Sequence, residues 1–176
     1  MRPADLTPVS RDALRAPARP VVIVLSFVLA LLFNFLPWSG WALAMRPDWV
    51  LLLLVFWALH APRAVGQGLA FALGLAMDVG DSMLLGQHAL AYVVATFGAQ
   101  ALRVRVLAFG LGEQTLHVLG LFAVATALTA VSNALAGGSY PGWLVLLAPA
   151  TTALCWAPIA AALLSPRLRR RASDPA

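Results

Sequence analysis

Charge is scarce in this sequence, and lysine is missing altogether. Only 11% of the 176 residues are charged and all twelve basic residues are arginines, whereas 61% of the residues are hydrophobic. Soluble globular domains carry roughly a quarter charged residues, and a chain of this size could not bury so much apolar surface in water. The composition excludes an ordinary soluble domain and favours a chain that is solvated by lipid.

Cysteine is also nearly absent, and no cofactor motif is present. The single cysteine, Cys155, lies inside an apolar run, so no intrachain disulfide can form and the thiol is expected to pack as a small hydrophobic group. Gly110 and Gly112 lack the preceding strand and third glycine of a dinucleotide fingerprint. We therefore expect no cofactor.

Long apolar runs separated by short polar segments are the main feature that is present. They predict an all-α, polytopic membrane protein with about six transmembrane helices in one bundle, since a span needs about 20 apolar residues. Residues 1–20 are interpreted as a basic leader, 21–164 as the transmembrane domain and 165–176 as a basic tail. A cleaved signal peptide ending near residues 42–44 is the less favoured alternative for the first run. The expected spans are 21–36, 49–59, 65–79, 84–102, 114–136 and 143–164.

The second apolar run is short for a span. Residues 49–59 would cover only about half of the ~30 Å hydrocarbon core as a helix. We expect the helix to extend back towards Trp41 through Arg46, Pro47 and Asp48, which places Arg46 and Asp48 near the interface, able to pair or to snorkel. The alternative is a half-span that neighbouring helices bury.

Small residues follow one another at a spacing of four in the third run. Gly66, Ala70 and Gly74 form a small-xxx-small pattern, which lets two helix backbones approach closely. The pattern predicts that this helix packs tightly against another and is central to the bundle.

The arginines predict the orientation of the chain. Eleven of them fall on one side if the apolar runs alternate across the membrane, in the two ends of the chain and the loops near residues 60–63 and 103–105. Only Arg46, with Asp48 and Asp81, falls on the other. By the positive-inside rule the arginine-rich side is cytoplasmic, so both termini are expected there. Because these arginines lie at helix ends and chain ends, we expect contact with anionic lipid and not with nucleic acid.

Asp78 is the candidate functional residue, because an ionisable group at membrane depth is costly. The structural alternative is that Asp78 caps a helix end or binds neighbouring backbone. Asp81 and Ser82 are expected to cap the start of the fourth span. Together with His88, these residues are too loosely spaced to predict a metal site or a Ser–His–Asp triad.

Residues 46–63 contain a recognisable pattern. Arg-Pro-Asp-Trp at 46–49 opens an apolar run with Trp57 near its end, followed by Pro62 and Arg63. Leu-Pro-Trp at 36–38, Gly74 four residues before Asp78, and Leu-Gly at 85–86 follow the same order. From residue 21 to about 102 the chain resembles the MreD family of rod shape-determining proteins.

This resemblance implies a non-catalytic component of the bacterial elongation machinery in the inner membrane, with a fold similar to the substrate-binding subunits of energy-coupling-factor transporters. Its implied partners are a bitopic MreC-like protein, actin-like MreB, a RodA-type glycosyltransferase and a class B penicillin-binding transpeptidase. The alternative function is a substrate-binding subunit of a small-molecule transporter. An intramembrane enzyme has no supporting feature. The candidate partner-packing or structural residues are Gly66, Ala70, Gly74, Asp78, Arg46, Asp48, Trp49 and Trp57.

Overall fold

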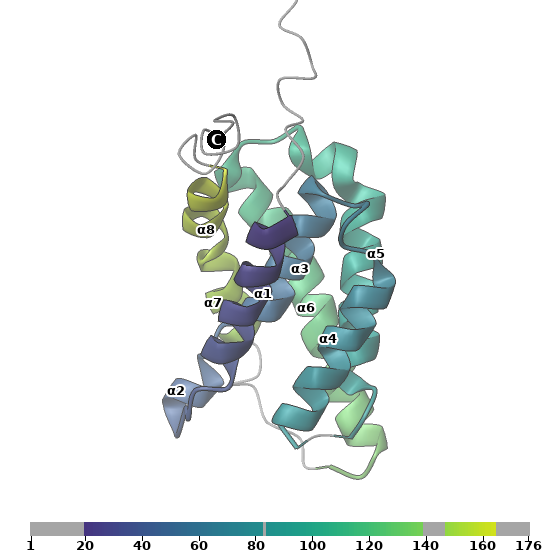
Figure 1. Ribbon diagram of the computed structural model, residues 1–176. Helices are drawn as coiled ribbons and strands as arrows, with labels where there is room; N and C mark the ends of the chain where they lie inside the picture. Colours follow the sequence, from purple (N-terminus) through teal and green to yellow (C-terminus); the bar gives the residue numbers. More distant parts are fainter. Residues whose placement is uncertain (1–19, 83, 139–146, 165–176) are drawn as a thin grey trace, which may run out of the picture.

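The computed structural model describes residues 20–82, 84–138 and 147–164, and every regular element within these ranges is an α-helix (Figure 1). The all-α prediction is confirmed for this part of the chain. Nearly all of the predicted leader and the whole basic tail lie outside the described residues. The helices are α1 (Pro20–Asn34), α2 (Trp41–Ala44), α3 (Trp49–His60), α4 (Gln67–Gly80), α5 (Gln87–Leu107), α6 (Leu111–Leu135), α7 (Leu147–Leu154) and α8 (Trp156–Leu163).

Each of the six apolar runs contains a helix, but the helices differ in length. By length and composition, α5 and α6 are long and apolar enough to cross a membrane. The helices α1, α3 and α4 have 15, 12 and 14 residues, which at about 1.5 Å per residue corresponds to roughly 18–22 Å. These three are shorter than the ~30 Å core of a typical bilayer.

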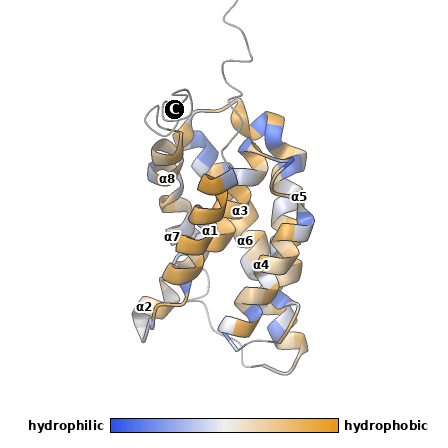
Figure 2. Cartoon of the chain, viewed as in Figure 1, coloured by the Kyte–Doolittle hydropathy of each residue, from blue (hydrophilic) through white to orange (hydrophobic). Residues whose placement is uncertain are grey.

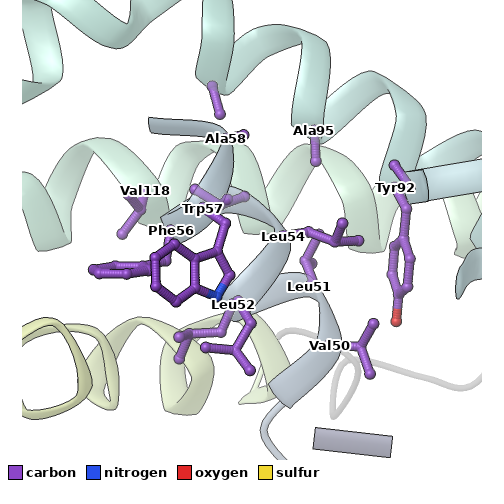
Figure 3. Packing of buried hydrophobic residues seen from close by; sticks show 14 of the residues in the cluster. Val50, Leu51, Leu52, Leu54, Phe56, Trp57, Ala58, Tyr92, Ala95 and Val118 are labelled. Carbon is purple, nitrogen blue, oxygen red and sulfur yellow. The ribbon is translucent and has the colours of Figure 1, made fainter. Parts of the chain in front are cut away.

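The helix α3 occupies the centre of the bundle. Every residue from Val50 to Leu59 is buried, and α3 packs against α1, α5, α6 and α7. A helix that is apolar on all sides is stable only where it is covered on all sides, and this sequence has no polar face. Figure 3 shows its side chains reaching Ala95 of α5 on one side and Val118 of α6 on another. The expectation that the third apolar run is central was therefore wrong, since α4 packs mainly on α5.

The second apolar run does not extend back through Arg46 as expected. The short helix α2 ends at Ala44, and residues 46–48 are not helical. Pro47 disfavours helical geometry in the residue before it, and Asp48 caps α3 by accepting a hydrogen bond from Leu51 N at 3.0 Å. The alternative interpretation, a short helix buried by its neighbours, describes α3.

The predicted close approach at the third run is confirmed for part of its small-residue pattern. Ala70 and Gly74 are buried on α4, and a Cβ at position 74 would collide with backbone atoms of Ala89 on α5. Gly66 precedes α4 and a Cβ there would meet no atom within 4 Å. The close approach joins α4 to α5 of the same chain.

The last apolar run forms two short helices, α7 and α8. The break falls at Cys155, which precedes the first residue of α8. Pro158 lies three residues further on and has no N–H to donate to the preceding turn, so it is tolerated only in the first turn of a helix. The proline therefore places a helix start at this point within the run.

Apolar side chains also cover much of the surface. The helix α1 is hydrophobic along its whole length (Figure 2) and packs mainly against α3. Its outward side presents large apolar residues that are exposed: Val21, Val24, Leu25, Val28, Leu29, Leu32 and Phe33. An exposed apolar surface of this extent indicates contact with lipid or with another protein.

Candidate functional site

Polar side chains from four helices and one linker converge at a single end of the bundle, which we call the Asp48 end. There α1 and α4 finish, α3 and α5 begin, and α7 passes alongside. The direct bonds described below connect these elements to one another. We call the set the polar network; it consists of Asn34, Arg46, Asp48, Asp78, Asp81, His88, Tyr92 and Thr152.

Asp48 connects four helices. Its Oδ1 atom accepts hydrogen bonds from Leu51 N at 3.0 Å and from Asn34 Nδ2 at 3.2 Å. Its Oδ2 atom accepts a hydrogen bond from the Tyr92 hydroxyl at 2.7 Å, and its backbone N–H donates to Thr152 Oγ1 at 2.9 Å. One residue thus joins the start of α3 to α1, α5 and α7.

Asn34 and Arg46 extend these connections to α4. Asn34 is fully buried; its Oδ1 accepts from Trp49 N at 3.3 Å, and its backbone oxygen accepts from Arg46 Nη1 at 2.9 Å. Both Nη atoms of Arg46 also donate to the Asp81 carboxylate, at 3.3 and 2.9 Å. Arg46 and Asp48 were expected to be able to pair, but each is bonded to other residues.

Asp78 holds the start of α5. Its side chain is fully buried; Oδ2 accepts from Gly86 N at 2.7 Å, and Oδ1 accepts from His88 N at 2.8 Å. The His88 Nδ1 atom lies 2.9 Å from the same Oδ1. Gly86 has φ 105°, in the left-handed region that favours glycine.

The expectation that Asp81 and Ser82 cap the start of α5 was therefore wrong. Asp81 instead ends α4 and pairs with Arg46. Asp78 reaches the free N–H groups because it lies one turn earlier on α4, at the level where α5 begins. This is the structural alternative considered for Asp78, namely a bond to neighbouring backbone.

Two aromatic rings, those of His88 and Tyr92, connect Asp78 to Asp48. The His88 ring meets the Tyr92 ring edge-on, with centroids 5.8 Å apart and planes at 74°, and Tyr92 in turn bonds to Asp48. Figure 3 shows Tyr92 beside Val50, at the start of α3. The network is thus continuous from the α4–α5 pair to α1, α3 and α7.

The two candidate tryptophans lie at different places. Trp49 begins α3 within the polar network, with its ring centroid 6.1 Å from that of Phe33. Trp57 lies two turns further along α3, where its Nε1 donates to Ser26 Oγ of α1 at 3.0 Å. Four of the eight candidates lie at the network: Arg46, Asp48, Trp49 and Asp78. Gly74 lies next to the start of α5, beside His88. The other three lie elsewhere: Gly66, Ala70 and Trp57.

Tyr92 and Thr152 are network residues that sequence reasoning missed. Asn34, near the end of an apolar run, indicates only that some interhelical hydrogen bond is formed there. Within an apolar run, a tyrosine or a threonine gives no signal of which neighbouring helix it will face. The available signal was positional, because Asn34, Asp48, Asp78 and His88 all lie where an apolar run ends or begins.

The chemistry of the network is that of mutual hydrogen bonding. The carboxylates of Asp48, Asp78 and Asp81 each accept at least two hydrogen bonds from protein donors. Within the described ranges, no three His, Cys, Asp or Glu side chains converge as metal ligands would. The arrangement fixes helix ends relative to one another.

The fold and the network define an all-helical protein with bilayer-length apolar helices and a hydrogen-bonded polar end. The family model described as rod shape-determining protein MreD matches residues 18–163, and the chain belongs to this family, as the sequence resemblance predicted. The family is one of rod shape-determining membrane proteins.

One curated relative is the rod shape-determining protein MreD of Haemophilus influenzae. It is 38% identical over 64 residues, a segment that makes up 36% of this chain and 40% of the relative. The matched segment thus spans less than half the length of that relative. No solved structure matches the chain.

Proposed function

We propose that this protein is a non-catalytic integral membrane scaffold of the bacterial cell-elongation complex, required for rod shape and for lateral peptidoglycan synthesis. It binds the transmembrane segment of an MreC-like bitopic protein. MreB, a RodA-type glycosyltransferase and a class B penicillin-binding transpeptidase belong to the same complex. Membership of the MreD family is the observation that carries this proposal. The proposal includes a fold similar to the substrate-binding subunits of energy-coupling-factor transporters and a function without a cofactor.

The proposed topology has six spans in the inner membrane, formed by α1, α3, α4, α5, α6 and the α7–α8 pair, with both termini in the cytoplasm. The distribution of described arginines supports it. Arg46 lies at the Asp48 end, whereas Arg63, Arg103 and Arg105 lie at the opposite end of the helices. Positive charge collects on the cytoplasmic side of membrane proteins, so the Asp48 end is assigned to the periplasmic side.

The outward side of α1 is the surface that we assign to the partner's transmembrane helix. It is apolar over its whole length and α1 makes its main contact with α3 alone, whereas α6 packs on α5, α7 and α8. The small-residue pattern is a poorer candidate, because Ala70 and Gly74 are buried within the chain. Helices associate in lipid through close packing, and α1 offers a continuous face for it.

The engagement of Asp78 supports a scaffold over the transport alternative. A ligand site needs polar groups that converge on a cavity, whereas both oxygens of Asp78 accept hydrogen bonds from the backbone that starts α5. Asp48 is likewise bonded to three donors. These residues carry structural bonds, which is what a scaffold requires of them.

Site-specific photo-crosslinking in native membranes tests this function. A photoreactive residue replaces Leu29 on α1 in one variant and Val124 on α6 in the control; the two side chains are 55% and 50% exposed. We expect Leu29 to crosslink to the MreC-like protein and Val124 not to do so. Crosslinks to ATPase subunits and a coupling membrane protein would instead make the chain a transporter subunit.

A further inference from the structure

The loop between α3 and α4 is fastened to α5 at both of its ends. Arg103 Nε donates to the Leu59 backbone oxygen at 2.5 Å, and Gln100 Nε2 donates to the Val65 backbone oxygen at 2.9 Å. A third hydrogen bond, from Gln67 Nε2 to Gln100 Oε1 at 2.9 Å, joins the first residue of α4 to α5. Residues 60–66 are therefore held against the turn of α5 that contains Gln100 and Arg103.

This arrangement holds the loop that carries Arg63 against the turn of α5 that carries Arg103. Arg63 is exposed and lies within the fastened loop, between the two backbone oxygens that α5 binds. The bond from Nε uses one side of the Arg103 guanidinium and fixes its position. In the described part of the chain, the basic side chains that contact carboxylates are Arg46 and His88, both at the Asp48 end. Neither Arg63 nor Arg103 is paired with a carboxylate within these residues.

Exposed apolar side chains flank Arg103 along α5. Its neighbours in the sequence, Leu102 and Val104, are 40% and 84% exposed. Exposed apolar side chains directly beside a cationic group are what a helix presents at the boundary between acyl chains and headgroups. This setting favours a phosphate that is carried by a lipid headgroup over a free phosphate ion.

We propose that Arg63 and Arg103 form a binding site for the phosphate of an anionic phospholipid headgroup at the end of α5. Guanidinium groups bind phosphate oxygens through paired, charge-assisted hydrogen bonds. Two of them, held by a fastened loop and a helix, define a place for one headgroup. The site lies at the end of the bundle remote from the polar network and goes beyond the scaffold function, which does not depend on it.

Native mass spectrometry of the full chain in detergent tests the site, with dioleoylphosphatidylglycerol and dioleoylphosphatidylcholine as probes. Arg63→Gln is the test variant, because this side chain is exposed. Arg105→Gln is the matched control: it removes the same charge from the same end, but Arg105 lies two residues from Arg103 and so faces away from it on the helix. We expect Arg63→Gln to weaken phosphatidylglycerol binding about fivefold and Arg105→Gln to leave it within twofold.

Three results would overturn the proposal. Equal losses in the two variants would mean diffuse attraction without a defined site. Equal binding of the two lipids by the wild-type chain would mean that the headgroup charge is not recognised. Displacement of bound lipid by millimolar inorganic phosphate would assign the site to a free anion.

Discussion

Single residues at the Asp48 end and along α4 set the distances between helices. At position 74 the backbones of α4 and α5 approach so closely that a Cβ would meet the backbone of Ala89 and the carbonyl carbon of His88. That approach brings the end of α4 to the start of α5, where Asp78 accepts its hydrogen bonds. Gly74 and Asp78, one helical turn apart, therefore act on the same contact.

We predict that Gly74→Ala lowers the free energy of unfolding by about 2 kcal/mol, because the added methyl group overpacks a contact formed by backbone atoms. The measurement is reversible unfolding in mixed micelles, followed by circular dichroism. Gly68→Ala is the matched control, since a Cβ there meets no atom within 4 Å. Equal effects of the two substitutions would contradict the close approach.

The role of Asp78 shows what the sequence could and could not provide at this scale. Its position in an apolar run identified it as a residue that needs a partner. The partner could not be identified, because Gly86 N and His88 N become available only once the loop after α4 returns the chain to the same level. The bonds of Asp48 to Asn34, Tyr92 and Thr152 could not be predicted either. They depend on how helices that are distant in the sequence are placed.

At the scale of elements, the ion pair of Arg46 and Asp81 joins the linker before α3 to the end of α4. Arg46 precedes α3 and Asp81 ends α4, and the pair is bidentate with side chains only 18% and 19% exposed. Arg46 also binds the backbone oxygen of Asn34, the last residue of α1. The linker before α3 thereby holds the ends of α1 and α4 together.

A double-mutant cycle with Arg46→Gln and Asp81→Asn measures this connection. We predict a coupling energy of about 1 kcal/mol, at the upper end for exposed pairs because the geometry is bidentate and the side chains are mostly buried. Arg46→Gln alone should cost more than Asp81→Asn alone, since it also removes the bond to Asn34 O. Strictly additive effects would show that the pair contributes nothing to holding the elements together.

The boundaries of α3 were misjudged because two signals in the sequence disagreed. Pro47 and Asp48 are the residues that begin a helix, whereas the length of a bilayer span requires a start several residues earlier. The structure follows the local signals, because burial by neighbouring helices removes the need for α3 to match the bilayer. The small residues on α4 indicate one close neighbour and not a central position. The sequence that is typical of a central helix is that of α3, which is apolar on all sides.

At the scale of the whole molecule, the distribution of charge and the family agree. The chain belongs to the MreD family over residues 18–163, and the described arginines other than Arg46 lie at the end opposite the polar network. The long apolar runs predicted a helix in each of six segments, whereas α2 and the division of the last run into α7 and α8 were not predicted. The packing order around α3 could not be predicted, because in lipid it depends on shape and not on the removal of apolar surface from water.

Labelling with a membrane-impermeant maleimide tests the proposed orientation in intact cells. In a Cys155→Ala background, we predict that Ser39→Cys reacts from outside, whereas Ala64→Cys reacts only after the membrane is permeabilised. Both positions are exposed in loops, at opposite ends of the bundle. The reverse pattern would invert the topology, and labelling of both positions in intact cells would contradict an odd number of crossings between them.

The enclosed position of α3 has a consequence for how the protein is made. In the proposed topology, α3 reaches the membrane after α1 but before α5, α6 and α7, which also pack against it. Until α7 emerges, the N–H group of Asp48 has no Thr152 hydroxyl to bind, and α3, a helix of about 18 Å, lacks its later neighbours. The packing around α3 is therefore completed only after the C-terminal half has been made. A chain truncated before α7 leaves α3 without part of its packing and without the bond from Asp48 to Thr152.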